Sequence, residues 1–489
     1  MTNDLILVLD AGTTSTRAIA FSTGGDIIAS AGRPLTQHYP ASGWVEHDAG
    51  EIWRFSRDCL LEVADTVGAQ RIACIGITNQ RETIVFWDRE TGEPLSNAIV
   101  WQDRRTADMC AAIKAHEPAV QAKTGLLLDP YFSGTKIRWA LENWPLVAAA
   151  QMAGRLLVGT VECWLIWKLS NGAAHVTDAT NASRTLLMDL ATCAWDDDMM
   201  ALIGVPRAIL PEIVDCAGPL ATTALLGGSV AITGAAGDQQ AAAIGQGCLL
   251  PGQLKATYGT GCFLLAHAGP AAPVSTNRLL STVAWRLDGK PAYALEGAIF
   301  TAGAAVQWLR DGLGLIASSA ETEALAASVP DSGGVTFVPA LAGMGAPHWQ
   351  PEARGLICGI SGGTTRAHLV RATLEAMGQQ TADLVEALAA DGVPAAKLRV
   401  DGGMVANDWL CQDLSDSLGV PVERPRVIET TAMGAAMLAG VGAGLFADLA
   451  SAAAQMAAAD RTFLPTSDSA ARAARRAVWA QAVSRTLLA

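Results

Sequence analysis

The feature that most constrains the fold is a strand–turn–strand pattern that occurs twice, about half a chain apart. Residues 5–21 read LILVLDAGTTSTRAIAF, and residues 253–269 read QLKATYGTGCFLLAHAG. In both segments short apolar runs, too short for helices, flank a turn of Gly and Thr. Two copies at this spacing predict two lobes, each of which begins with a hairpin.

The remaining segments alternate between strand and helix patterns. Residues 71–80 predict a strand that ends in polar residues, and residues 408–419 predict a helix that ends at Gly419. Residues 397–408 predict a strand, a Gly-Gly turn and the start of a helix. Mixed segments of this kind indicate an α/β protein.

Length and composition agree with large buried cores. The chain has 489 residues, of which 51% are hydrophobic and 17% are charged, so we expect more than one domain and no disorder. The net charge of −13 disfavours nucleic acid and anionic membranes as partners. Ten Cys without a CxxC pair indicate reduced thiols in a cytoplasmic protein. The N-terminal stretch MTNDLILVLDAG lacks the basic start of a signal peptide.

Several polar or apolar runs are interpreted as structural elements without a chemical role. Residues 44–53 contain Asp48 and Glu51 at the spacing of a helix N-cap and its partner. Residues 194–200 predict a helix start rather than a metal site. The uncharged run at 430–447 predicts a close-packed buried helix instead of a membrane span. The stretch from 467 onward predicts a solvated terminal helix.

One carboxylate stands in a strongly apolar segment. Asp238 is the only charged residue between Asp215 and Lys255. A solvated loop would carry more charges, and a plain core element would carry none. Asp238 therefore needs partners or a chemical task.

A second candidate is Asp10, which closes an apolar strand before the turn Gly12–Ser15. Small hydroxylated residues offer N–H and O–H groups to phosphate oxygens, and a carboxylate beside them can hold Mg²⁺ through waters. Taken alone, an ordinary hairpin is the better interpretation, but the second Gly-Thr turn allows two lobes to clamp one polyphosphate. The Walker sequence GxxxxGK[ST] is absent from the chain, so the predicted phosphate site is not a P-loop.

Three further segments carry polar or aromatic residues between apolar runs. Arg81 and Glu82 could present a guanidinium and a carboxylate to a polyol, although the residues alone favour a solvated turn. Trp101 and Tyr131 could line a small pocket or belong to the core. The glycines at 402–403 allow a close approach of a base or a phosphate, or simply form a tight turn.

Six segments together resemble the FGGY carbohydrate kinases, and among them the members that phosphorylate glycerol. They follow in order from residue 5 to about 445 and read GITNQRET, NAIVWQDRRT, DPYFSGTK, GAAGDQQAA, YGTGCF and RVDGGMVAN. The resemblance implies an α/β protein with two actin-like (ribonuclease H-like) lobes. It implies a cytoplasmic transferase that binds ATP, Mg²⁺ and glycerol in the cleft between the lobes.

The resemblance also assigns roles to the lobes and to single residues. The first lobe, residues 1–246, would bind glycerol, phosphate and Mg²⁺, and the second, residues 247–489, would bind the nucleotide. The residues that would hold glycerol are Arg81, Glu82, Trp101, Tyr131, Asp238, Gln239 and Phe263. The residues that would contact the nucleotide are Thr13, Thr14, Ser15, Arg17, Thr260, Gly303, Gln307, Gly403 and Asn407. Asp10 would lie at the Mg²⁺.

In this family context Asp238 is expected to be the base that accepts the proton of the attacking glycerol hydroxyl, with Arg81 helping to keep it ionised. Because relatives form dimers and tetramers, the resemblance implies a homo-oligomer. Two alternatives stay open. One is a sister kinase that acts on another polyol or ketose such as erythritol or xylulose, and the other is a non-catalytic actin-like ATP-binding protein.

Two departures from the family concern its regulation. Some bacterial members carry a longer Gly/Arg loop that binds fructose 1,6-bisphosphate, whereas residues 224–234 are short and lack Arg. Other members carry a phosphorylatable His in that loop, and this chain has no His between His175 and His267. We therefore expect neither control in its known form.

Overall fold

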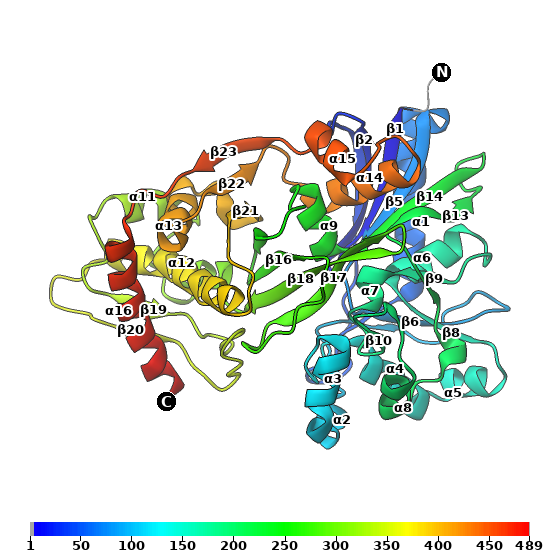
Figure 1. The fold of residues 1–489 in the computed structure, drawn as a ribbon, viewed down its shortest axis with the longest axis horizontal. Coiled ribbons are helices and arrows are strands. Elements are labelled where there is room, and N and C mark those ends of the chain that lie inside the picture. The colour runs from blue at the N-terminus through cyan, green and yellow to red at the C-terminus, as the bar shows by residue number, and fades with distance from the viewer. Residues whose placement is uncertain (1–3, 489) are drawn as a thin grey trace.

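The computed structural model describes residues 4–488, so the first three residues of the N-terminal stretch lie outside the described part. The chain forms two lobes (Figure 1), each built on one large sheet. The strands of the first sheet, from edge to edge, are β13 (Ala217–Thr223), β14 (Val230–Gly237), β5 (Ile72–Asn79), β1 (Leu5–Ala11), β2 (Ser15–Ser22) and β3 (Ile27–Pro34). Those of the second are β17 (Leu280–Leu287), β18 (Lys290–Ile299), β16 (Cys262–Gly269), β15 (Gln253–Tyr258), β21 (Lys397–Asp401), β22 (Val422–Pro425) and β23 (Ala459–Phe463).

The two sheets repeat one arrangement, which confirms the two-lobed α/β fold expected from the duplicated hairpin. In the first sheet β1 pairs antiparallel with β2 and parallel with β5, and β5 pairs parallel with β14. In the second sheet β15 pairs antiparallel with β16 and parallel with β21, which pairs parallel with β22. An antiparallel strand, β13 or β23, closes each parallel edge.

Smaller sheets extend the lobes. A four-stranded sheet of the first lobe contains β4 (Glu46–His47), β7 (Ala98–Ile99), β6 (Ile84–Asp88) and β8 (Leu156–Thr160). The two-stranded pairs are β9 (Val176–Asp178) with β12 (Glu212–Val214), β10 (Met188–Asp189) with β11 (Ala194–Trp195), and β19 (Thr336–Val338) with β20 (Leu356–Cys358).

Helices cover the sheets. Those of the first half of the chain are α1 (Ala49–Val67), α2 (Ala107–Ala112), α3 (Glu117–Thr124), α4 (Ser133–Asn143), α5 (Pro145–Met152), α6 (Val161–Leu169), α7 (Ala179–Ala182), α8 (Asp197–Ile203) and α9 (Asp238–Gly245). Those of the second half are α10 (Gly303–Gln307), α11 (Glu321–Ala327), α12 (Arg366–Ala390), α13 (Asp408–Leu418), α14 (Thr430–Gly442), α15 (Leu449–Met456) and α16 (Ser469–Leu487). The helix predicted over 408–419 is confirmed, and Gly419 ends it in a left-handed conformation.

The small residues of α14 allow it to cross α9 at backbone contact. A Cβ added to Gly434 would lie 1.8 Å from the carbonyl oxygen of Ala241, and one added to Gly245 would lie 1.9 Å from that of Thr430. Only glycine fits at such a crossing. The buried helix predicted in the run 430–447 is therefore confirmed, and it packs on the first sheet. The boundary between the two lobes at residues 246 and 247 stays a prediction. The helix α14 comes after that boundary in sequence, but it packs against the first lobe.

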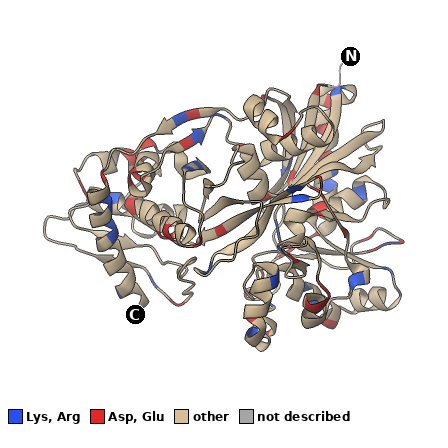
Figure 2. Ribbon diagram, in the orientation of Figure 1, with Lys and Arg blue, Asp and Glu red and all other residues tan. Residues whose placement is uncertain are grey.

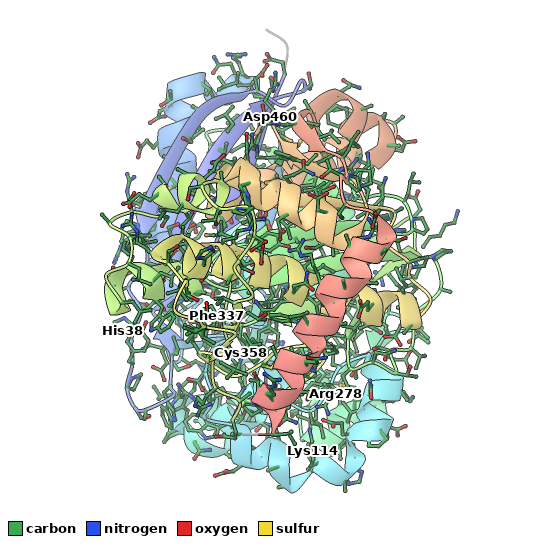
Figure 3. The ribbon with its side chains drawn as sticks, turned by 90° about the vertical axis from the view of Figure 1, so that its left-hand side faces the viewer. His38, Lys114, Arg278, Phe337, Cys358 and Asp460 are labelled. Atoms are coloured by element: carbon green, nitrogen blue, oxygen red, sulfur yellow. The ribbon has the colours of Figure 1, made fainter. Side chains whose placement is uncertain are left out.

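The C-terminal helix α16 is only partly solvated, so the prediction of a solvated helix is wrong for one face. Trp479 is buried, and its indole N–H donates to Oδ2 of Asp383 at 2.9 Å. Figure 3 shows α16 lying across the outer side of the second lobe, where it contacts β19, β20 and α13. The sequence analysis did not predict this buried face of α16, because Ala and Arg dominate the stretch from residue 467.

The capping predictions hold with one exception. Asp48 and Asp196 accept N–H bonds at the starts of α1 and α8. Glu51, however, accepts from the N–H of Thr36 at 2.7 Å and does not return to the cap.

The cysteines all lie within the described residues and are free thiols, and only Cys358 is not fully buried. None of the helices within residues 4–488 is both long and apolar enough to span a membrane. Basic and acidic residues are interspersed over both lobes (Figure 2).

Candidate active site

Three parallel strands of the first sheet end side by side. Ala11 of β1 pairs with Asn79 of β5, and Asn79 pairs in turn with Gly237 of β14. The carboxyl ends of neighbouring parallel strands share one edge of a sheet, and α/β proteins bind ligands at such edges. The predicted residues that follow these three strands are therefore brought together.

Asp238 is the first residue of α9, directly after the end of β14. Its Oδ1 atom accepts the backbone N–H of Gln239 at 2.7 Å and lies 3.3 Å from Nε of Arg81. About a third of the Asp238 side chain, 32%, is exposed, so a substrate can reach it. Burial raises the pKa of Asp238, while the positive charges of Arg81 and Lys255 oppose this shift.

Arg81 and Glu82 form a buried turn between β5 and β6, so the solvated turn favoured by the residues alone is wrong. Their exposed fractions are 3% and 1%. Glu82 has a φ of 61°, a left-handed conformation that is uncommon for residues other than glycine. The turn is closed by the N–H of Thr83, which donates to the carbonyl of Arg81 at 2.7 Å.

Two charged residues that the sequence analysis missed, Arg184 and Glu296, surround this turn. Nη1 of Arg81 donates to Oε2 of Glu296 at 2.6 Å, and Nη2 of Arg184 donates to Oε1 of Glu296 at 2.9 Å. Nε of Arg184 donates to Oε1 of Glu82 at 2.6 Å. The charges that neutralise Arg81 and Glu82 thus come from distant parts of the chain, and the sequence around residues 81–82 does not report this pairing.

Three aromatic rings form a wall beside these charges. The centroids of Trp101 and Tyr131 lie 5.7 Å apart, and those of Trp101 and Phe263 lie 6.3 Å apart, both nearly perpendicular. Phe263 belongs to β16 of the second lobe, so the wall spans the junction between the lobes. The indole N–H of Trp101 donates to Oγ1 of Thr13 at 2.9 Å, which connects the wall to the first Gly-Thr turn.

Gln239 is oriented by a lysine of the second lobe. Nζ of Lys255, on β15, donates to Oε1 of Gln239 at 2.5 Å. Lys255 is buried, and burial lowers its pKa while Asp401 and Asp238 oppose the shift. This lysine is a further candidate for the site that the sequence analysis did not select.

The first Gly-Thr turn places a buried carboxylate beside an arginine. Nη2 of Arg17 lies 2.8 Å from Oδ2 of Asp10, and Nη1 lies 2.8 Å from Oε2 of Glu429. Burial raises the pKa of Asp10, and Arg17 opposes this shift. Thr14 and Ser15 lie in the same turn, where the N–H of Gly12 donates to the carbonyl of Ser15 at 3.0 Å.

In the second lobe the corresponding turn touches two glycine-rich segments. The N–H of Gly303, at the start of α10, donates to the carbonyl of Gly259 at 2.9 Å. A Cβ at Gly303 would lie 2.5 Å from that same oxygen. Gly402 has a φ of +93°, and a Cβ there would lie 2.4 Å from the carbonyl oxygen of Tyr258. Thr260, at the tip of the turn, is exposed.

Two of the residues predicted to bind the nucleotide, Gln307 and Asn407, take no part in the contacts of this turn described above. Gln307 ends α10 with its side chain exposed. Asn407 caps α13, where its Oδ1 accepts the N–H of Leu410 at 2.9 Å and its Nδ2 donates to Thr322 at 3.1 Å. Gly403 starts the short helical turn that precedes Asn407.

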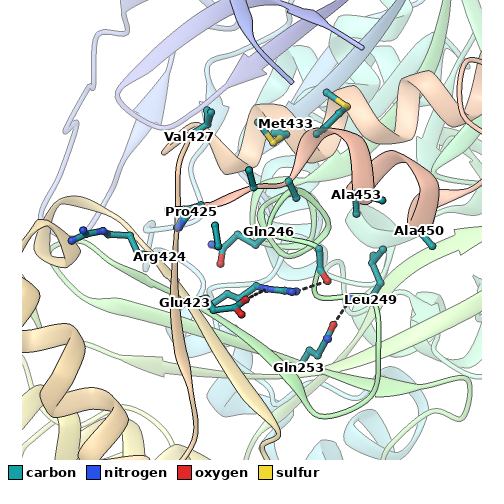
Figure 4. A pocket seen from close by; sticks show the side chains of 18 of the residues that line it. Gln246, Leu249, Gln253, Glu423, Arg424, Pro425, Val427, Met433, Ala450 and Ala453 are labelled. Atoms are coloured by element: carbon teal, nitrogen blue, oxygen red, sulfur yellow. Dashed lines mark hydrogen bonds and ion pairs between the residues drawn. The ribbon is translucent and has the colours of Figure 1, made fainter. Parts of the chain in front are cut away.

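A cavity of about 430 Å³ lies at the end of α9 opposite Asp238 (Figure 4). Its polar side chains pair with protein groups. Nε of Arg399 donates to Oε2 of Glu423 at 3.0 Å, and Nε2 of Gln246 donates to Oδ2 of Asp401 at 2.6 Å. Among the described residues, those that line this cavity include none of the predicted site residues, so the candidate active site lies elsewhere.

The comparisons with known proteins cover nearly the whole chain. The sequence model of the FGGY family of carbohydrate kinases, N-terminal domain, matches residues 5–245, and that of the C-terminal domain matches residues 254–443. A glycerol kinase of Rhodospirillum rubrum is 54% identical, over 98% of this chain and 98% of that relative.

Two solved structures are similar over their full length. The crystal structure of Plasmodium falciparum glycerol kinase with ADP has a TM-score of 0.94 at 37% identity, and covers 99% of this chain and 98% of that one. The xylulose kinase of Rhodospirillum rubrum has a TM-score of 0.88 at 26% identity, with 99% and 98% covered. This chain therefore belongs to the FGGY family of carbohydrate kinases.

Proposed function

We propose that this chain transfers the γ-phosphoryl group of ATP to glycerol, which gives ADP and sn-glycerol 3-phosphate for glycerol catabolism. The observation that carries the proposal is the pairing of Asp238 with Arg81 at an edge walled by Trp101 and Phe263. A polyol needs donors, acceptors and an apolar surface for its carbon atoms, and this edge supplies all three. The 54% identity to a glycerol kinase, against 26% to a xylulose kinase, supports glycerol as the acceptor.

Asp238 acts as the general base of this reaction. Its carboxylate accepts the proton of the attacking hydroxyl while the hydroxyl oxygen bonds to the γ-phosphorus, and the β–γ bridging oxygen leaves with ADP. General-base help is typically about 10²–10⁴-fold. Phosphoryl transfer needs little covalent work from a protein, so positioning and charge account for the remainder.

The neighbouring side chains hold the polyol. Arg81 donates to substrate oxygens and Glu82 accepts from substrate hydroxyls, because a vicinal diol presents both kinds of group. Tyr131 and Gln239 add hydrogen-bonding groups. Trp101 and Phe263 pack against the carbon face, as the perpendicular aromatic wall suggests.

The phosphate chain lies between the two Gly-Thr turns. From the first lobe its oxygens bind Thr13, Thr14, Ser15 and Arg17. From the second lobe Thr260 and Gly303 line it, and Gln307, Gly403 and Asn407 line the ribose and adenine. We infer that residues 1–246 bind glycerol, phosphate and Mg²⁺ and that residues 247–489 bind the nucleotide, with Phe263 of the second lobe also contacting the polyol.

The donor set at Asp10 fits Mg²⁺. Magnesium usually takes one or two carboxylates and keeps its remaining ligands as waters and substrate phosphates. Asp10 is one such carboxylate beside the phosphate turn, and its charge also raises the pKa of Asp238. Within residues 4–488 no group of three or more His, Cys, Asp or Glu side chains is placed to hold a metal ion. When bound, Mg²⁺ neutralises charge on the phosphates.

We infer a homo-oligomer, a dimer or a tetramer, in the cytoplasm. The inference rests on the family and on free, buried cysteines. Light scattering of the purified protein tests the first part, and cell fractionation tests the second. A monomer, or recovery in the membrane or periplasmic fraction, would contradict it.

A coupled assay for ADP with a panel of acceptors tests the proposed function. Glycerol, erythritol and xylulose are compared with a reaction that lacks acceptor. We expect glycerol to give the highest kcat/KM, because erythritol and xylulose must place extra carbon atoms and hydroxyls in a site that pairs the hydroxyls of glycerol. A preference for erythritol or xylulose would instead identify a sister kinase, and ATP binding without any turnover would identify a non-catalytic protein.

A further inference from the structure

Glu296 is a carboxylate of the second lobe that is bonded to two arginines of the first. It lies on β18, at the junction of the lobes (Figure 1), and only 2% of its side chain is exposed. Oε2 accepts from Nη1 of Arg81 at 2.6 Å, and Oε1 accepts from Nη2 of Arg184 at 2.9 Å. Each carboxylate oxygen is thus committed to a different guanidinium.

Arg184 completes a closed group of four charges. Its Nε donates to Oε1 of Glu82 at 2.6 Å, and Nε of Arg81 lies 3.8 Å from that same oxygen. The guanidinium of Arg184 also lies over the rings of Phe132 and Tyr131, at 5.2 and 5.7 Å. Arg184 therefore fixes the turn that carries Arg81 and Glu82 through its bonds to Glu82 and Glu296.

Glu296 keeps its charge in this setting. Although burial favours the neutral acid, Arg184 and Arg81 lower the pKa of Glu296 to about 2. A guanidinium with a fixed anion on Nη1 has its rotation restricted, and its planar fork is then held in one orientation. In that orientation Nε of Arg81 faces Asp238.

We propose that Glu296 is a positioning residue: from the second lobe it holds Arg81 in the orientation that serves Asp238 and the polyol. The inference rests on the proposed function, since it concerns the same site. Glu296 need not touch the substrate. It acts through Arg81, and it makes the polyol site depend on a strand of the opposite lobe.

The test compares Glu296→Gln with wild type and with Asp413→Asn. Asp413 is a matched control, because it is a buried carboxylate of the second lobe, 7% exposed and 2.7 Å from Arg475, outside the site. We expect Glu296→Gln to raise the KM for glycerol by about tenfold or more, with the KM for ATP changed less than about twofold. Asp413→Asn should lower the melting temperature, but it should not raise the KM for glycerol more than the KM for ATP.

The pH profile gives a second readout that a purely structural role would not move. Without the Glu296 anion, Arg81 is no longer held beside Asp238 and opposes the raised pKa of Asp238 less, so the acid limb of kcat should move to higher pH in Glu296→Gln. Asp413→Asn should leave this limb in place. If Glu296→Gln does not fold, Glu296→Asp keeps the charge on a shorter side chain and should show a smaller rise in the KM for glycerol.

Equal changes in both KM values, or an unmoved acid limb, would overturn the positioning role. Failure of the proposed function is seen separately, in the wild-type protein. If wild type prefers another acceptor of the panel, glycerol is wrong as the substrate, and the same KM comparison is made with that acceptor.

Discussion

Nε of Arg81 lies 3.3 Å from Oδ1 of Asp238, and the two residues follow the ends of neighbouring parallel strands, β5 and β14. The same guanidinium bonds Glu296 of the other lobe through Nη1. Arg81 therefore connects the proposed base to the second lobe.

Arg81→Ala should weaken glycerol binding far more than ATP binding. A hydrogen bond from a charged donor is worth about 1.5–3 kcal/mol, so the KM for glycerol should rise by roughly 10–100-fold. Steady-state kinetics with each substrate varied in turn measures the effect. An equal rise in both KM values would place Arg81 on the nucleotide side.

The activity should fall as the pH drops below the pKa of Asp238. Burial raises the pKa of Asp238 above its usual 3.8, and a protonated carboxyl cannot accept the hydroxyl proton. Because Arg81 opposes the rise, Arg81→Ala should move the acid limb of kcat/KM to higher pH. A limb that moves to lower pH, or not at all, would show that another group controls it.

Much of the fold follows from local patterns in the sequence. The two hairpins, the strand at 71–80 and the helix after Asn407 all form where apolar spacing and turn residues predict them. Asp238 could be selected because a lone charge in an apolar run is visible in sequence. Glu296 shows the same signal, since it is the only charged residue between Lys290 and Arg310, and it could have been found in the same way.

The buried state of Arg81 and Glu82 could not be predicted locally. Adjacent charges next to a strand end are usually solvated, and here they are buried only because distant partners neutralise them. Arg81 and Glu296 are separated by 215 positions in sequence. Pairing over such a distance depends on how the two sheets meet, and short-range spacing contains no information about it.

Gly303→Ala should impair the nucleotide side. The new Cβ would lie 2.5 Å from the carbonyl oxygen of Gly259, so the Gly-Thr turn must shift. Because misplacement of about 1 Å can cost up to about 10²-fold in rate, we expect kcat/KM for ATP to fall by roughly tenfold or more. Gly362→Ala serves as the control, since a Cβ there meets no atom within 4 Å. A variant with unchanged ATP kinetics would contradict the assignment of this turn.

His267→Phe should stabilise the protein in mildly acidic solution. The imidazole stacks on Trp285 with centroids 4.8 Å apart, and neither ring nitrogen has a hydrogen-bond partner within the described residues. Burial lowers the pKa of His267 to about 4 from 6.5, so the unfolded chain binds the proton more readily. Wild type should therefore lose stability as pH falls from 6.5 towards 4, by at most about 3 kcal/mol from this group.

Urea unfolding at pH 7 and pH 5 measures that difference. The advantage of His267→Phe over wild type should be larger at pH 5 than at pH 7. An advantage that shrinks at pH 5 would contradict the buried, neutral state of His267.

The most direct measurement of the central claim is glycerol-dependent ADP release by Asp238→Asn. Asparagine keeps the shape of the side chain but cannot accept a proton, so kcat should fall by about 10²–10⁴-fold, while the KM for ATP and the melting temperature stay close to wild type. If Asp238→Asn released ADP at the full wild-type rate, Asp238 would not be the base and the account of the site would be wrong.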